Sequence, residues 1–165
     1  MGFSKKIWLL LVSIPLLMIS GCSMLGITNY TPPSVNASNT AKLRLIGEDY
    51  KRAFPGPHFT IHQGEENKGT IEAKVIKNMP DFPKAAGESK RYEDAYYEIP
   101  IYSDVMTRVV YTSTGCTVSV NFIPKAGKYY EVMASLKDKL GYCVLYKAQL
   151  QYDDENNLYV LESIK

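Results

Sequence analysis

Residues 116–136, CTVSVNFIPKAGKYYEVMASL, contain the pattern on which the fold prediction depends. Apolar and polar side chains alternate along Cys116–Ile123 and again along Lys128–Leu136, and this period of two is typical of a β-strand with one buried face. The intervening residues 124–127 (PKAG) are a short turn sequence. We therefore predict that these two strands form a β-hairpin.

The same alternation recurs through the chain after residue 40. It is clear in Ala41–Ile46 and Thr70–Ile76. Weaker strands are predicted at Phe59–His62, Tyr97–Tyr102, Val105–Thr112, Tyr142–Leu150 and Leu158–Leu161.

Helix has little support in the sequence. The stretch Pro83–Tyr97 contains Gly87 and lacks an apolar stripe at helical spacing, so we expect a long loop there with one helical turn. Short strands without helices to cover both faces of a parallel sheet predict an all-β fold. We expect an antiparallel β-sandwich of seven to nine strands, immunoglobulin-like or transthyretin-like.

The first 21 residues form a separate segment. Lys5 and Lys6 precede the apolar run Ile7–Ile19, which is the pattern of a secretory signal peptide. As a helix this run spans about 20 Å, whereas the hydrocarbon core of a bilayer is about 30 Å thick, so a transmembrane anchor is disfavoured.

The charge balance excludes one class of partner. The chain has 19 basic and 17 acidic side chains, and Lys5 and Lys6 account for the whole excess. Nucleic-acid recognition needs clustered excess Lys and Arg, so nucleic acid is not an expected partner of residues 22–165. At 144 residues this part has the size of one ordinary domain.

The segment Ile19-Ser20-Gly21-Cys22 resembles the lipobox of bacterial lipoproteins. The resemblance implies cleavage before Cys22, a thioether to diacylglycerol and an acylated amine, so that membrane lipid becomes a partner through Cys22. Two or three acyl chains hold a protein stably to a bilayer. Inner-membrane retention typically uses Asp after the cysteine, and because Ser23 stands there the resemblance favours the periplasmic face of the outer membrane over the inner membrane.

We divide the chain into a cleaved signal peptide (residues 1–21), lipidated Cys22 with a flexible tether (22–40) and a β-sandwich domain (41–165). The tether is rich in Ser, Thr, Asn and Pro and has no sustained apolar period. Fully extended, it reaches at most about 60 Å.

Two cysteines, Cys116 and Cys143, remain once Cys22 is lipidated. An even number in an exported chain indicates one disulfide. A plain three-strand meander would place the two residues roughly 9 to 10 Å apart, too far for a bond. Either the bond joins the two sheets, or one strand curls over its neighbour, or both thiols are reduced; we favour a bond.

Metal and calcium sites have only weak support. His58 and His62 are four residues apart, but the strand-forming residues between them put the two imidazoles about 13 Å apart, so a metal site completed by Glu65 or Glu66 is not predicted. The run Asp153–Asn157 lacks the ligand spacing of a calcium loop and fits a polar turn better.

Catalytic motifs are missing from the sequence. It contains no Gly-x-Ser-x-Gly elbow and no dinucleotide-binding glycine motif. Residues 64–69 have the glycine spacing of a phosphate loop, but Thr70 stands in place of the lysine. We predict no cofactor and no catalytic residues.

Tyrosine is the compositional excess, with 13 in the chain, all after the leader. Tyr92, Tyr96, Tyr97 and Tyr129 are candidate binding residues because exposed tyrosines offer a large contact area with a polar tip. The alternative is that tyrosine simply suits half-buried strands.

Three further stretches resemble small, uncharacterised proteobacterial lipoproteins: NTAKLRL (residues 39–45), GC (115–116) followed by FIPKAGKYYE (122–131), and YCV (142–144). In that group a cysteine-started strand, a Phe-x-Pro-x-x-Gly-x-x-Tyr-Glu turn and a second cysteine recur. The resemblance implies the β fold and a bond between the two cysteines, and it departs at residues 77–99, which are longer than in the group. It implies no activity.

These patterns together predict a periplasmic, lipid-anchored protein that binds or braces an envelope protein partner without catalysis. One alternative is a ligand or glycan receptor that uses the tyrosines and residues 79–96. The other is an envelope hydrolase.

Overall fold

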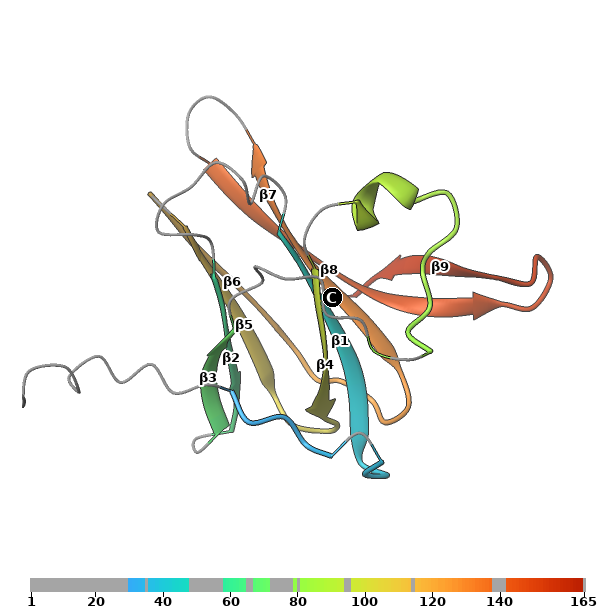
Figure 1. Cartoon of the computed structure of the whole chain (residues 1–165), viewed down its shortest axis with the longest axis horizontal. Coiled ribbons are helices and arrows are strands. Elements are labelled where there is room, and N and C mark those ends of the chain that lie inside the picture. The colour runs from blue at the N-terminus through green and yellow to red at the C-terminus, as the bar shows by residue number, and fades with distance from the viewer. Residues whose placement is uncertain are drawn as a thin grey trace, which may run out of the picture.

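Within the residues that the structure describes, nine β-strands form two sheets packed face to face (Figure 1). The computed structural model describes residues 30–34, 36–47, 58–64, 67–71, 79, 81–93, 96–113, 115–137 and 142–164. The five-stranded sheet has the order β4 (Tyr96–Tyr102), β1 (Thr40–Gly47), β7 (Tyr129–Lys137), β8 (Tyr142–Asp153), β9 (Leu158–Ser163). The four-stranded sheet has the order β3 (Asn67–Ile71), β2 (His58–Gln63), β5 (Thr107–Ser113), β6 (Cys116–Phe122).

The predicted all-β sandwich is confirmed, with one exception to its antiparallel pairing. β1 and β7 pair in parallel, with Leu43 opposite Tyr130, whereas the other strand pairs are antiparallel. Alternation of side chains shows which face of a strand is buried but carries no information on strand direction. The predicted helical turn is also present, as a 3-10 helix over Ser89–Tyr92.

The predicted hairpin of residues 116–136 is wrong. β6 pairs with β5 in one sheet and β7 pairs with β1 and β8 in the other, so the turn between them crosses from sheet to sheet. The N–H of Gly127 donates to Thr40 O (2.8 Å) and Pro124 O accepts from the N–H of Asp104 (2.7 Å). The turn therefore bonds to its neighbours at this end of the sandwich, and Gly127 supplies the positive φ (72°) that it needs.

The predicted strand Thr70–Ile76 is confirmed only where it overlaps β3, over residues 70–71, and β3 begins three residues earlier than predicted. β3 covers Asn67–Ile71, and residues 72–76 lie outside the described residues. The signal peptide, Cys22, Glu65 and Glu66 lie outside them as well.

The main core fills the space between the sheets with the inward-facing side chains of both. Its fully buried members are Ala41, Leu43, Leu45, Phe59, Ile61, Ile101, Val109 and Val132. At one end of this core a disulfide joins Cys116 on β6 to Cys143 on β8, with the Cα atoms 6.1 Å apart. The bond joins the two sheets, which is the first of the three arrangements considered above.

The end of the predicted tether belongs to the folded domain. Tyr30 is buried in the main core, and its hydroxyl donates to Gln63 Oε1 (2.6 Å). The chain then runs along the end of the sandwich, where Asn39 O accepts from the N–H of Ser103 (2.9 Å). Ordered contacts thus begin well before the predicted boundary at residue 41. No helix in the described ranges has the length and apolar character needed to cross a bilayer.

Candidate functional site

The candidate site lies on the outer face of the five-stranded sheet, which faces away from the other sheet. Part of this face is covered by residues 81–93, called here the cover segment, which contains the 3-10 helix (Figure 1). A second apolar cluster lies beneath it. Its buried members are Ile46, Phe82, Ala85, Tyr92, Tyr96 and Leu150.

Three charged residues form a row across this face. The strand register places Arg44 on β1 directly between Glu98 on β4 and Glu131 on β7. Arg44 Nε donates to Glu98 Oε1 (2.7 Å), Nη1 donates to Glu131 Oε1, and all three side chains are buried. The guanidinium also donates from Nη2 to Pro83 O (2.9 Å) in the cover segment. The row therefore holds the cover segment to the sheet.

Aromatic rings surround the Arg44 guanidinium. Its Cζ atom lies 4.1 Å from the ring centroid of Phe82, 4.7 Å from that of Tyr92 and 5.5 Å from that of Tyr96. Cation–π contacts strengthen when the cation is removed from water, as Arg44 is. The paired carboxylates are closed to solvent, and the row serves as a structural group between the sheet and the cover segment.

Tyr92 connects the row to the cover segment. Its hydroxyl donates to Glu131 Oε1 (2.9 Å) and accepts from the N–H of Ala85 (2.9 Å). Burial raises the pKa of Tyr92 to about 12, and the negative charge of Glu131 acts in the same direction. Tyr92 therefore stays neutral at physiological pH and serves as a hydrogen-bonding bridge.

Arg91 marks the border of the buried cluster. Its Nε lies 3.1 Å from Glu131 Oε2, and its Nη1 lies 3.6 Å from Glu88 Oε2. Glu131 thus faces two arginines, Arg44 and Arg91, which balance the two buried carboxylates of Glu98 and Glu131.

A shallow groove of about 340 Å³ opens beside Arg91 over β7, β8 and β9. It is lined by Arg91, Met133, Tyr146, Lys147, Ala148, Leu161 and Ser163. Lys147 Nζ donates to Asn121 O (2.7 Å), and Arg91 already faces two carboxylates. The two carboxylates offset the charge of Arg91, and the Lys147 ammonium is bonded to β6 of the other sheet, so the groove suits an apolar or neutral group.

Strand β9 forms the edge of the sheet along this groove. At one point the cover segment already adds to that edge: Ala85 forms a parallel bridge with Tyr159, and the N–H of Ala86 donates to Tyr159 O (2.9 Å). Backbone groups of alternate residues point the same way, so those of Leu161 and Ser163 also face the edge. Among the described residues, no hydrogen bond from outside the β8–β9 pair reaches these two.

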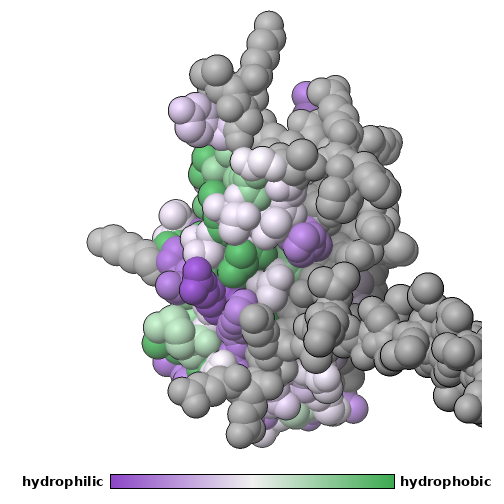
Figure 2. Space-filling view, turned by 90° about the vertical axis from the view of Figure 1, so that its left-hand side faces the viewer, coloured by the Kyte–Doolittle hydropathy of each residue, from purple (hydrophilic) through white to green (hydrophobic). Residues whose placement is uncertain are grey.

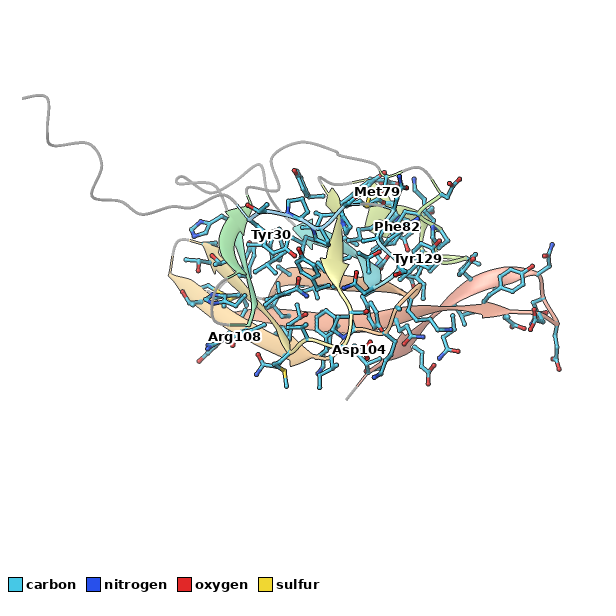
Figure 3. The ribbon with its side chains drawn as sticks, turned by 90° about the horizontal axis from the view of Figure 1, so that it is seen from below. Tyr30, Met79, Phe82, Asp104, Arg108 and Tyr129 are labelled. Carbon is cyan, nitrogen blue, oxygen red and sulfur yellow. A yellow bond between two sulfur atoms is a disulfide. The ribbon has the colours of Figure 1, made fainter. Side chains whose placement is uncertain are left out.

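A series of aromatic rings continues from the cover segment onto the β8–β9 hairpin, which projects beyond the sandwich (Figure 1). Phe82 contacts Tyr129 (centroids 5.2 Å apart), Tyr129 contacts Tyr159 (6.3 Å), and Tyr159 contacts Tyr152 (5.1 Å). Met79, Phe82 and Tyr129 lie together on one side of the molecule (Figure 3). Lys42 Nζ lies 5.1 Å from the Tyr129 ring centroid.

The four predicted tyrosines do not form one exposed platform. Tyr92 and Tyr96 are only 8% and 3% exposed, so the exposure assumed for them is wrong: they pack on Arg44 beneath the cover segment. Tyr97 packs against the main core on the other face of β4, and Tyr129 is half-buried in the aromatic series. Their places beside a predicted loop, or opposite the presumed core face, suggested exposure to solvent, whereas the cover segment packs over part of this face.

The tyrosines that border open surface were not selected from the sequence. Tyr146 lines the groove, and Tyr152 and Tyr159 lie on the projecting hairpin. The alternation of residues 142–150 carried a usable signal, because it puts Tyr146 on the face opposite Cys143, away from the core.

The other candidates lie where the strand pattern placed them. His58 and His62 occupy one face of β2, opposite buried Phe59 and Ile61. No group of three or more metal-binding side chains occurs in the part of the chain that the structure describes. Residues 153–157 form the polar β8–β9 turn. There Asp153 accepts from the side-chain amide of Asn156 (2.7 Å), which holds the pKa of that carboxyl below its usual value.

Comparison with known proteins gives no independent assignment. No protein-family model matches the chain, and no curated protein sequence is detectably similar to it.

Proposed function

We propose that this protein is a lipid-anchored, non-catalytic component of the bacterial cell envelope that binds an extended segment of a partner protein at the edge of β9. The anchor is the acylated Cys22, on the periplasmic side of the outer membrane. The binding surface comprises the exposed edge of β9 and the groove beside it.

Export is supported by two independent features. The leader and the lipobox-like Ile19–Cys22 are sequence features. The Cys116–Cys143 bond is the structural one, because disulfides persist in oxidising compartments and are rare in the cytosol.

The single observation that carries the binding proposal is the bridge between Ala85 and Tyr159. Here the chain adds its own extended segment to β9, and two further sets of backbone groups, those of Leu161 and Ser163, continue the same edge. An incoming strand would use these groups, as in β-strand addition, where main-chain hydrogen bonds give affinity and pockets for alternate side chains give specificity.

The groove indicates which side chains such a segment would carry. Every second residue of an added strand faces the same side of the sheet. An apolar side chain there would contact Met133 and Leu161, while the neutralised Arg91 offers no attraction to an acidic one. The expected ligand is therefore an extended peptide with apolar residues at alternate positions.

Photo-crosslinking in intact cells tests this proposal. A photoreactive phenylalanine analogue replaces Tyr146, which lines the groove, or Tyr142, which lies on the same strand and face and is 67% exposed. We expect a discrete protein adduct from position 146 and a much weaker one from position 142. Ser163→Pro removes an N–H group at the edge of β9, and combined with the photoreactive residue at position 146 it should reduce the adduct from that position. Equal adducts at both positions, or none at 146, would contradict strand addition.

The anchor has its own test. Metabolic labelling with a palmitate analogue should tag the wild-type protein and not Cys22→Ala. Equal labelling of both, or labelling of neither, would remove the lipid anchor from the proposal.

The groove also favours a second candidate, a receptor for a small apolar ligand, since its volume falls in the usual range for such sites. Mass spectrometry of the natively purified protein distinguishes the two functions: a stoichiometric small molecule lost in Ala148→Met, which fills the groove, would favour the receptor. Among the described residues that line the groove, none is a carboxylate or a histidine.

A further inference from the structure

Two features lie at the same end of the sandwich: exposed apolar side chains, and the point where the N-terminal part of the chain enters the domain. The β4–β5 turn carries Met106, which is 55% exposed, and the β6–β7 turn carries Ile123, which is 49% exposed. Figure 3 views this end from below, with Tyr30 and Asp104 labelled.

Met106 and Ile123 are neighbours. The β5–β6 ladder ends with Thr107 opposite Phe122, and one further step in the same register places Met106 opposite Ile123. Because Thr107 and Phe122 are buried between the sheets, the next pair faces outward. Figure 2 looks onto the side of the molecule where the four-stranded sheet lies and shows apolar surface in its upper half and, over a smaller area, at the lower left.

The two turns are fixed to each other. The N–H of Asp104 donates to Pro124 O (2.7 Å), and Lys125 Nζ lies 2.7 Å from Asp104 Oδ1. This ion pair raises the pKa of Lys125 and lowers that of Asp104, so both stay charged near neutral pH. The two exposed apolar side chains therefore lie on turns that are bonded to each other.

The chain length before the domain places this end near the anchor. Buried Tyr30 bonds to Gln63, and Gln63 is opposite Thr107, the residue after Met106. Tyr30 follows Cys22 by only eight residue steps, which fully extended reach at most about 28 Å. β7 alone, from Tyr129 to Lys137, spans about 30 Å, so the opposite end of the sandwich lies farther from the anchor.

We propose that this end of the sandwich rests on the phospholipid bilayer that holds Cys22, with Met106 and Ile123 inserted at the boundary between headgroups and acyl chains. The inference rests on the lipid anchor of the proposed function. Two apolar side chains are far too few to bind a membrane alone. Once the acyl chains hold the domain at the bilayer, these two side chains suffice to orient it. The edge of β9 and its groove then have a fixed orientation relative to the membrane.

Tryptophan fluorescence tests the orientation, because the only tryptophan, Trp8, lies in the predicted signal peptide and is absent from the processed protein. Met106→Trp, Ile123→Trp and Tyr142→Trp are purified as mature lipidated proteins and reconstituted into phosphatidylethanolamine–phosphatidylglycerol vesicles with brominated acyl chains. Tyr142 is the matched control, since it is exposed at the end of the sandwich that carries the disulfide.

We expect bromolipids to reduce the emission at positions 106 and 123 about twofold, with a blue shift, and to leave position 142 almost unchanged. Equal quenching at all three positions, or none at 106 and 123 in protein whose mass shows the lipid, would overturn the orientation while leaving the anchor intact. A mass without lipid on Cys22 would overturn the anchor and this inference together. A non-reducing mass that retains the Cys116–Cys143 bond verifies that each variant is folded.

Discussion

Each of the two faces of the five-stranded sheet has a buried region, but the two regions are buried by different means. On the inner face, Leu43 of β1 and Val132 of β7 pack against the four-stranded sheet in an apolar core. On the outer face of the same two strands, Arg44 and Glu131 form an ion pair beneath the cover segment. Alternate residues of one strand thus enter two cores of opposite chemistry.

This difference determines how each face responds to change. An apolar contact is lost in proportion to the atoms removed, because burial is non-directional. A buried charge network depends on all of its members, since removing one leaves its partners desolvated and unpaired. The outer face is therefore the more sensitive of the two to a single substitution.

The largest effect is expected from Arg44→Met. The substitution leaves Glu98 and Glu131 buried with only Arg91 to offset them, and breaking a buried pair costs about 3 to 5 kcal/mol. Urea denaturation should show this loss in the free energy of unfolding, and rapid exchange of the Ala86 amide should show release of the cover segment from β9.

Leu43→Ala on the inner face is the comparison, with an expected cost of about 2 to 5 kcal/mol. The distinguishing variant is Arg44→Met combined with Glu98→Leu and Glu131→Leu. Replacing a whole buried charge network by apolar residues is often neutral, so this triple variant should recover most of the lost stability. If it is less stable than Arg44→Met alone, the charge row is not the cause of the sensitivity.

The sequence predicts which side chains are buried on the inner face of the five-stranded sheet, but it does not predict that side chains on the outer face are buried as well. A period of two identifies the strands and their apolar side, which suffices for the sandwich. The polar side is read as solvent-facing because the covering residues 81–93 carry no period of their own. Arg44 lies 54 residues from Glu98 and 87 from Glu131, so only the strand register brings the three together.

The misassigned hairpin has a related cause. The residues PKAG at 124–127 correctly predict a turn, but a turn sequence does not specify whether the flanking strands pair with each other. That choice depends on the partners of each strand, here β5 for β6 and β1 for β7. The Cys116–Cys143 bond was the clue, because a meander would have kept the two cysteines apart.

The next largest loss of stability is expected on removing the Cys116–Cys143 disulfide, which links the two sheets across the inner face; the cover segment has no such covalent link to the sheet. Cys116 and Cys143 are 27 residues apart, and in the chain-entropy model closing such a loop contributes about 3.5 kcal/mol. Cys116→Ala with Cys143→Ala should lower the free energy of unfolding by about this amount, measured in urea against the oxidised wild type. Exchange of the Ala86 amide relative to global unfolding should stay unchanged, since the cover segment is held by other contacts.

The smallest expected loss of stability comes from a single hydroxyl that links the cover segment to the sheet. Tyr92→Phe removes the hydroxyl that joins the Ala85 N–H to Glu131, at an expected cost of about 1 to 3 kcal/mol near neutral pH. Because the pKa of Tyr92 is raised to about 12 in the folded protein, from 10.0, its contribution is complete below pH 10 and is lost as the pH rises toward 12.

The pH dependence therefore distinguishes a hydrogen-bonding role from simple packing. At pH 11 the unfolded chain has largely ionised this tyrosine while the folded one has not, so the stability difference between wild type and Tyr92→Phe should shrink by about 1.4 kcal/mol relative to pH 8. Urea denaturation of both proteins at pH 8, 10 and 11 measures it, and general alkaline destabilisation cancels in the difference. A constant difference would mean that Tyr92 supports the cover segment only through its ring, on the face of Arg44.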